Sequence, residues 1–156
     1  MKSLDQESLT TLSMILLQIL EDRFPEWEPF MEAVESESEN DKRCLDFRIP
    51  APSDDGRFIS VRERGDCIEV GFSDGEPPGG TERLLIGDRG EERLLVEAAI
   101  EFVEQIIDEK IFIGREASWL WHSAMPPTFM TAEELPRKKL LKVVSWHGTY
   151  DSAIGQ

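Results

Sequence analysis

Three short segments in which apolar and polar residues alternate constrain the fold of this chain most strongly. They occupy residues 45–49, 58–63 and 68–72. A strand needs this period of two when one of its faces is buried and the other is open to water. The dipeptides Asp55-Gly56 and Gly65-Asp66 are typical of tight turns, so the segments predict an antiparallel meander. Residues 81–86, after a loop rich in Gly and Pro at 73–80, are expected to add a fourth strand.

The segment that precedes these strands predicts a helix over residues 4–22. Leu9, Leu12, Leu16 and Ile19 recur at spacings of three and four, which places them on one helix face. Pro25 interrupts the pattern and is expected to end the helix.

A shorter helix is expected after this proline. Its apolar face would consist of Trp27, Phe30, Met31 and Val34. Acidic residues of the same segment also recur at helical spacing, at Glu28, Glu32, Glu35 and Glu39. The interpretation is therefore an amphipathic helix whose outer face is acidic.

A long helix is predicted over residues 91–109. Its buried stripe would contain Leu95, Ala99, Phe102 and Ile106. A row of acids falls opposite that stripe at spacings of four, three and four, namely Glu97, Glu101, Glu104 and Asp108. Strands are expected over 111–114 and 140–146, with an irregular segment at 119–136 between them.

These elements predict an α+β fold. We expect an antiparallel sheet of about six strands, with the N-terminal helices and the one long helix packed on it. The length of 156 residues favours a single domain over 1–156. Within it, residues 1–42 would form an N-terminal helical segment and residues 43–156 a core of sheet plus helix.

The charge of the chain limits its partners. The formal net charge is −15, and residues 1–116 hold 29 acidic and 13 basic residues, a net of −16. Such acidity argues against nucleic acid and against anionic membranes, because both attract cations. No apolar run approaches the roughly 20 residues of a membrane span. Cys44 and Cys67 are too few for a disulfide framework, so we expect a cytoplasmic protein.

No spacing in the chain predicts a metal site, a cofactor site or a catalytic nucleophile. The metal-ligating residue types Cys44, Cys67, His122 and His147 form neither a C-x-x-C nor an H-x-x-x-H pair. The chain has no G-x-S-x-G elbow and no phosphate-binding glycine loop. We therefore expect a protein that is not an enzyme and that holds no cofactor or metal.

The acidic row on the long helix is the most informative candidate site. Like charges at such spacing cost a helix about 0.2–0.5 kcal/mol per pair. One interpretation is a solvated face that maintains solubility, and the other is a surface that steers a cationic partner. Trp119 and Trp121, in the irregular segment, are candidate aromatic anchors beside that row, unless they cover the sheet instead.

Three stretches of the chain resemble a pattern in small bacterial proteins. They are Ile68-Glu-Val-Gly-Phe-Ser-Asp-Gly75, the helix with its following strand at 91–114, and Val144-Ser-Trp-His-Gly-Thr-Tyr-Asp151. The resemblance covers residues 67–151. Many such proteins are uncharacterised, and some are immunity proteins of polymorphic or contact-dependent toxin systems. It implies a binding protein and carries over no catalytic residue.

Our leading hypothesis from the sequence is a non-enzymatic acidic binding protein. Most concretely, it is an immunity protein that neutralises a cognate basic toxin by occlusion. Glu97, Glu101, Glu104 and Asp108 would steer the partner. One alternative is a small ligand-binding or enzymatic domain with a pocket near 119–136. Another is a scaffold in which the first helix pairs with a copy of itself, and the sequence leaves the oligomeric state open.

Overall fold

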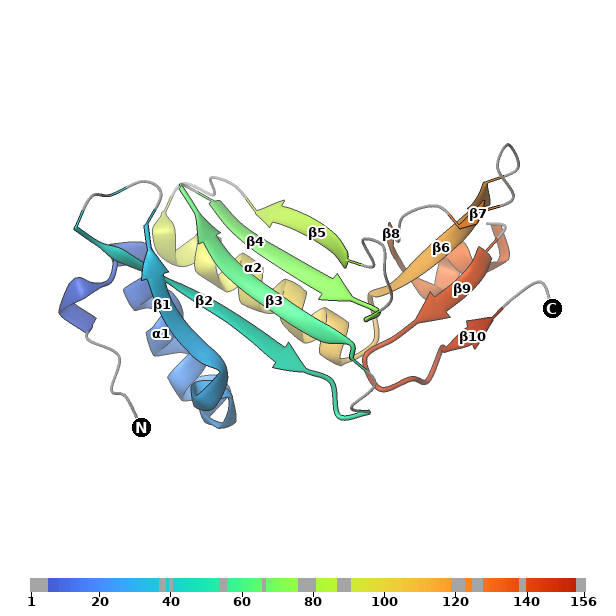
Figure 1. Ribbon diagram of the computed structural model, residues 1–156, viewed down its shortest axis with the longest axis horizontal. Helices are drawn as coiled ribbons and strands as arrows, with labels where there is room; N and C mark the ends of the chain where they lie inside the picture. Colours follow the sequence, from blue (N-terminus) through green and yellow to red (C-terminus); the bar gives the residue numbers. More distant parts are fainter. Residues whose placement is uncertain are drawn as a thin grey trace. The chain divides into compact units, whose positions relative to one another are not determined.

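The computed structural model describes residues 6–36, 39, 41–53, 56–65, 67–75, 81–86, 91–118, 123–124, 128–137 and 140–153. Its helical elements are η1 Gln6–Ser8, α1 Thr11–Arg23, η2 Pro25–Phe30, α2 Glu92–Ile107 and η3 Ala132–Arg137. Its first strands are β1 Met31–Glu35, β2 Arg43–Pro50, β3 Phe58–Arg64, β4 Cys67–Ser73 and β5 Thr81–Ile86. Its later strands are β6 Phe112–Ser118, β7 Ser123–Ala124, β8 Thr128–Met130, β9 Leu140–Val144 and β10 Ser152–Ala153. Figure 1 shows these elements along the chain.

The predicted α+β class, with its antiparallel strands, N-terminal helix and long helix, is confirmed. The described strands belong to two sheets, one in the order β1-β2-β3-β4-β5 and one in the order β10-β9-β6-β7, with β8 also paired to β6. The chain forms two compact units that interleave along the sequence. The first consists of 1–49, 60–70 and 84–101, and the second of 50–59, 71–83 and 102–156. The prediction of a single domain over 1–156 stays a prediction.

Helix α1 begins later than the sequence pattern predicts. Thr10 has extended backbone geometry and its side chain accepts a hydrogen bond from the Ser13 amide, which makes it the N-cap. Its own amide donates to the carbonyl of Arg43 at 2.9 Å, so the residue before the helix is tied to β2. The leucines of the predicted stripe are buried within the first unit, so they are not free to pair with a copy of the chain.

A buried carboxylate joins the start of α1 to the sheet. Glu63 on β3 is only 4% exposed, and its Oε2 accepts hydrogen bonds from the hydroxyls of Thr10 at 2.6 Å and Ser13 at 2.5 Å. The Ser13 hydroxyl in turn accepts from the amide of Leu45 at 2.8 Å. An anion at the positive end of a helix dipole is favourable, so this acid stabilises the docking of α1.

The shorter helix predicted after Pro25 is wrong. The chain forms only the 3-10 helix η2, and then the strand β1 over Met31–Glu35. Pro29 lies inside η2 and supplies no amide hydrogen to continue it. Met31 pairs with Phe47 and Glu35 with Arg43 in an antiparallel ladder. The four acids expected along one helix face are therefore divided among η2, β1 and the bend that follows.

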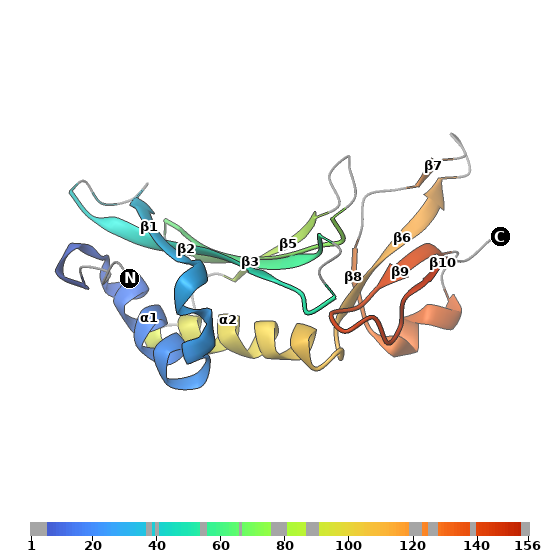
Figure 2. The same cartoon turned by 60° about the horizontal axis from the view of Figure 1, so that its bottom comes forward.

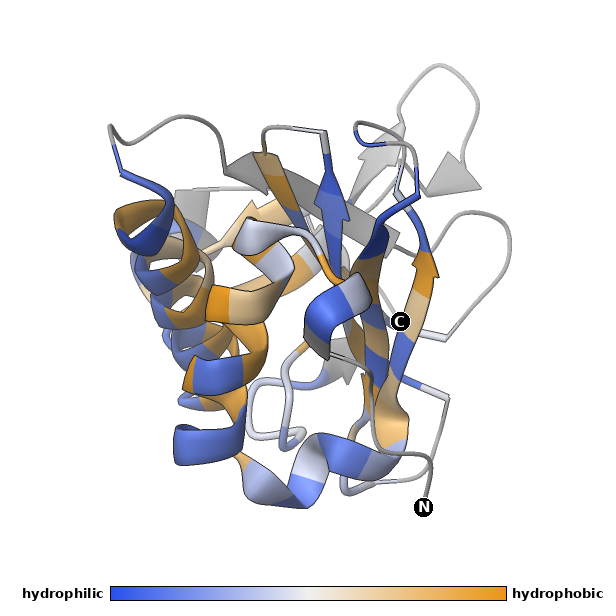
Figure 3. Cartoon of the chain, turned by 90° about the vertical axis from the view of Figure 1, so that its left-hand side faces the viewer, coloured by the Kyte–Doolittle hydropathy of each residue, from blue (hydrophilic) through white to orange (hydrophobic). Residues whose placement is uncertain are grey.

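The first sheet has one face covered by helices. In Figure 2, α1 and the first half of α2 lie on the same side of the strands of the first unit. Burial alternates along β3, where Ile59, Val61 and Glu63 are buried and the residues between them are half-buried. Figure 3 shows hydrophobic and hydrophilic segments alternating along helices and strands, as a one-sided core requires.

The second unit is built around β6. This strand pairs with β8, where Ile113 lies opposite Phe129, and with β9, where Gly114 lies opposite Val143. A buried ion pair also joins this strand to the end of β4. Arg115 Nε lies 2.9 Å from Asp74 Oδ2, and the two side chains are 9% and 1% exposed. Since an unpaired charge is costly at such burial, the pair fixes where the residue after β4 meets β6.

Candidate functional site

Three acids of the predicted row, Glu97, Glu101 and Glu104, lie on α2, and Asp108 directly follows its last residue, Ile107. Glu101 and Asp108 are exposed, whereas Glu97 and Glu104 are half-buried. The two earlier acids belong to the first unit and the two later ones to the second. Within each unit the two acids are four residues apart, the spacing of neighbours on one helix face. Whether the row binds a partner stays a prediction.

The two ends of the row differ in charge balance. Near the start of α2, Arg93 Nε lies 3.2 Å from Glu97 Oε1, so a cation one turn earlier offsets this acid. At the end, the Asp108 amide donates to the carbonyl of Glu104 at 2.8 Å and continues the helical bonding. The Asp108 side chain has no hydrogen bond or ion pair in the described part of the chain. It lies at the negative end of the helix dipole, where an anion is disfavoured.

Helix α2 ends on a residue with an unusual backbone. Glu109 has φ of 58°, in the left-handed region where glycine is the usual residue. The amides of Lys110 and Ile111 both donate to the carbonyl of Gln105, at 2.9 and 3.2 Å, and thereby terminate the helix. A side chain at such a φ costs roughly 1–2 kcal/mol, so other contacts of Glu109 must offset it.

These contacts come from the loop that follows β9. Oε1 and Oε2 of Glu109 accept hydrogen bonds from the Thr149 hydroxyl at 2.5 Å and the Thr149 amide at 3.2 Å. The Ser145 hydroxyl and the His147 backbone also donate to this carboxylate. Burial alone raises the pKa of Glu109, but the four hydrogen bonds outweigh it and lower the pKa from its ordinary value of 4.5.

The same loop, residues 145–151, is fixed from its other side by Arg57. This buried guanidinium donates to the Ser145 carbonyl at 2.5 Å, and its two terminal nitrogens lie 3.1 and 2.7 Å from the Asp151 carboxylate. Asp151 also accepts from the Ser145 amide at 2.9 Å. Gly148, at φ of 81°, provides the left-handed turn between them. The loop is thus held in one conformation by side chains from distant parts of the second unit.

This rigid loop displays an aromatic side chain. Tyr150 is 38% exposed and stacks on the buried Phe112, with ring centroids 5.0 Å apart and an interplanar angle of 21°. His147 and Thr149 beside it are exposed. Because Glu109 binds Thr149 directly, the loop lies against the end of α2 that carries Asp108. The second unit therefore combines the Asp108 carboxylate, which has no partner in the described chain, with the fixed aromatic ring of Tyr150.

Sequence reasoning did not select Tyr150 or Glu109. The anchors it selected, Trp119 and Trp121, lie outside the described residues, as does His122. The segment 144–151 contributed to the resemblance, and its one signal of a site was the grouping of His, Thr and Tyr around a glycine.

Ser145 lies near a carboxylate and near the backbone of a histidine, but its side chain is fully buried and already donates and accepts hydrogen bonds. A nucleophile needs access to substrate, which this hydroxyl lacks. Cys44 and Cys67 are free thiols. Across the described ranges, no group of three or more His, Cys, Asp or Glu side chains is placed to hold a metal ion.

No family model, curated protein or solved structure matches this chain. The resemblance to immunity proteins is therefore an expectation from the residues alone. In the described part of the chain, no helix has the length and apolar character to cross a membrane.

Proposed function

We propose that this chain is a non-enzymatic cytoplasmic binding protein that neutralises a cognate basic protein toxin by occlusion, as an immunity protein does. The observation that carries the proposal is the junction of the acidic row with the loop 145–151. There Asp108, the last acid of the row, is exposed, and the neighbouring Glu109 binds Thr149, the residue next to Tyr150, whose ring stacks on Phe112.

Each part of this junction has a role in binding. The acidic row attracts a basic partner over a distance of about one Debye length, roughly 8 Å at physiological salt, and orients the encounter. Tyr150 supplies aromatic area at low entropic cost, because its ring is already stacked on Phe112. Occlusion then needs no chemistry from this chain, since a bound surface covers the basic cleft of the toxin.

The test begins with capture of the partner from source cells by the tagged protein. A near-stoichiometric basic protein is expected, and its toxicity on expression should disappear when this chain is co-expressed. An empty bait, with expression of candidate partners verified, would contradict the proposal. So would a captured protein whose toxicity co-expression leaves unchanged.

A pair of matched charge reversals then tests the assigned face. Glu101→Lys with Asp108→Lys changes two exposed acids that have no fixed partner in the described chain. Glu26→Lys with Glu28→Lys makes the same charge change on η2. We expect the first pair to slow association with the captured protein by about tenfold or more and to flatten its salt dependence. If both pairs of substitutions slow association equally, the net charge of the protein steers the partner and the position of the acidic row does not.

A further inference from the structure

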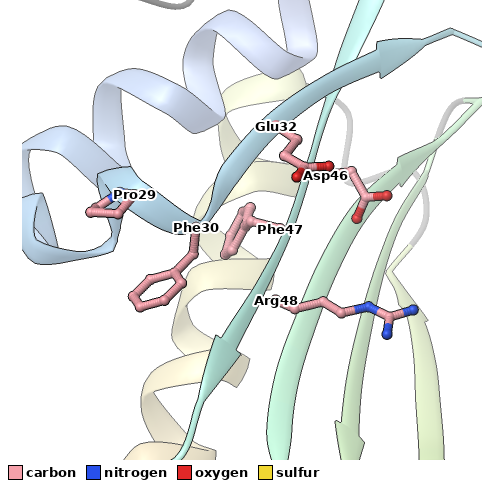
Figure 4. Close-up of a pocket in the computed structure, with 6 residues that line it drawn as sticks. All are labelled: Pro29, Phe30, Glu32, Asp46, Phe47 and Arg48. Carbon is pink, nitrogen blue, oxygen red and sulfur yellow. The ribbon is translucent and has the colours of Figure 1, made fainter. Parts of the chain in front are cut away.

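A pocket in the first unit is independent of the acidic row. It has a volume of about 280 Å³ and lies at the junction of η2, β1 and β2. Its lining consists of Pro29, Phe30, Glu32, Asp46, Phe47 and Arg48, drawn in Figure 4. Ligand pockets for drug-sized molecules are usually about 300–1,000 Å³, so this one suits a group the size of a single side chain.

Two carboxylates face each other in this pocket. Glu32 on β1 and Asp46 on β2 are direct partners in the antiparallel register, so their side chains share one face of the sheet. Residues in this relation have Cβ atoms about 4.5–5.5 Å apart, and like charges there are destabilising. Neither carboxylate has a hydrogen bond or ion pair in the described chain. Figure 4 shows them side by side, while the Arg48 side chain extends away from both.

Apart from Arg48, the remaining lining is apolar. Phe30 is 40% exposed, one of the few large apolar side chains open to water in the described chain, and Phe47 is buried at 2% exposure. Pro29 completes the apolar side. The pocket thus offers carboxylate oxygens at one end and carbon surface at the other. A ligand that suits it carries a cation on an apolar stem.

We propose that this pocket binds an arginine side chain of a polypeptide partner. A guanidinium presents five N–H donors in a planar fork, so it can donate to both carboxylates at once, whereas the compact ammonium of lysine has no such fork. Its aliphatic stem and planar face suit the open ring of Phe30. This inference rests on the proposed function only in that the partner is basic, and it assigns a second contact outside the row.

The probe for the experiment is a blocked amino acid, N-acetyl-arginine methylamide, titrated into the ¹⁵N-labelled protein and followed by amide chemical shifts. The full chain is used. We expect saturable shifts centred on Phe30, Glu32, Asp46 and Arg48, with a dissociation constant in the millimolar range. The citrulline analogue has nearly the same shape without the charge and should shift these amides at least tenfold less. The lysine analogue should bind more weakly than arginine.

Three variants make the assignment specific. Asp46→Asn and Glu32→Gln should each raise the dissociation constant for the arginine probe about tenfold or more. Glu35→Gln removes the same charge from an exposed position on β1 outside the pocket. This substitution should change the dissociation constant for the arginine probe by less than about twofold. Saturation without shifts in the pocket, equal shifts with citrulline, or equal weakening by Glu35→Gln would each overturn the inference.

The outcome is separable from that of the proposed function. Glu101→Lys with Asp108→Lys should leave the shifts caused by the arginine probe unchanged, because neither residue lines the pocket. If no basic partner is captured but the probe binds as described, the proposed function fails and the pocket assignment stands. If the partner is captured and the probe does not bind, the pocket assignment alone fails.

Discussion

Replacement of Glu109 separates two opposing contributions that meet at the end of α2. Its backbone lies in the left-handed region, which costs a non-glycine residue roughly 1–2 kcal/mol. Its carboxylate accepts bonds from Thr149, Ser145 and His147. Hydrogen bonds to a charged group contribute about 1.5–3 kcal/mol when buried, and less at a half-exposed position such as this one.

Two substitutions therefore differ in a predictable order. Glu109→Ala keeps the backbone cost and loses every carboxylate bond, so it should lower the free energy of unfolding by about 2 kcal/mol. Glu109→Gly loses the same bonds but removes the backbone cost, so it should be more stable than the alanine variant by about 1 kcal/mol. Urea titration followed by circular dichroism measures both differences.

The pH dependence gives an independent check. The pKa of Glu109 is lowered in the folded protein, so the folded state favours the carboxylate. Its contribution is fully present above the ordinary value of 4.5 and is lost as the pH falls through the folded pKa. Glu109→Gln should consequently be less stable than the wild type at pH 7, and the difference should shrink below pH 4.5.

Three results would refute this reasoning. Equal stability of the wild type and Glu109→Ala would mean that the loop bonds contribute nothing. A difference between wild type and Glu109→Gln that is the same at pH 3 as at pH 7 would mean that the charge of the carboxylate is not involved. A glycine variant less stable than the alanine variant would show that the left-handed backbone is not the cost we assign to it.

Two further predictions concern buried charges. Glu63→Ala removes a charged acceptor from two hydroxyls of α1 and should lower the free energy of unfolding by about 3 kcal/mol. Glu69→Ala, which breaks the more exposed ion pair with Arg64, should cost less than about 1 kcal/mol in the same urea titration, and equal losses would contradict the assignment. Asp74→Ala leaves the buried Arg115 unpaired and should cost about 3–5 kcal/mol. Thermal unfolding should show Asp74→Leu with Arg115→Leu recovering most of that loss, and a double variant less stable than the single one would refute it.

The parts of the fold that depend on local pattern were predictable. The expected strand at 81–86 matches β5, and the expected helix at 91–109 contains α2. The strand at 31–35 was not predictable, because the positions of Met31 and Val34 fit a helix as well as they fit a strand. The outcome there is decided by pairing with Phe47 and Cys44 on β2, which no local pattern contains.

The candidate site was predictable only in its helical part. The acidic row follows from residue spacing within one helix. The bond between Glu109 and Thr149 joins residues 40 positions apart, and that between Arg57 and Asp151 joins residues 94 positions apart. A left-handed glutamate gives no signal in sequence, since glycine is the residue expected at that position.

Two acids at the end of α2 lower the stability of the helix. Both Asp108 and Glu109 lie at the negative end of the helix dipole, which disfavours them. Four hydrogen bonds from the loop 145–151 offset the unfavourable position of the Glu109 carboxylate, so the protein itself compensates for this charge. Asp108 has no such compensation in the described chain, although a lysine there would favour the helix. Under the proposed function, a basic partner would supply the cation that Asp108 lacks beside the exposed ring of Tyr150, and Asp108→Lys should then weaken the captured complex more than Glu101→Lys does.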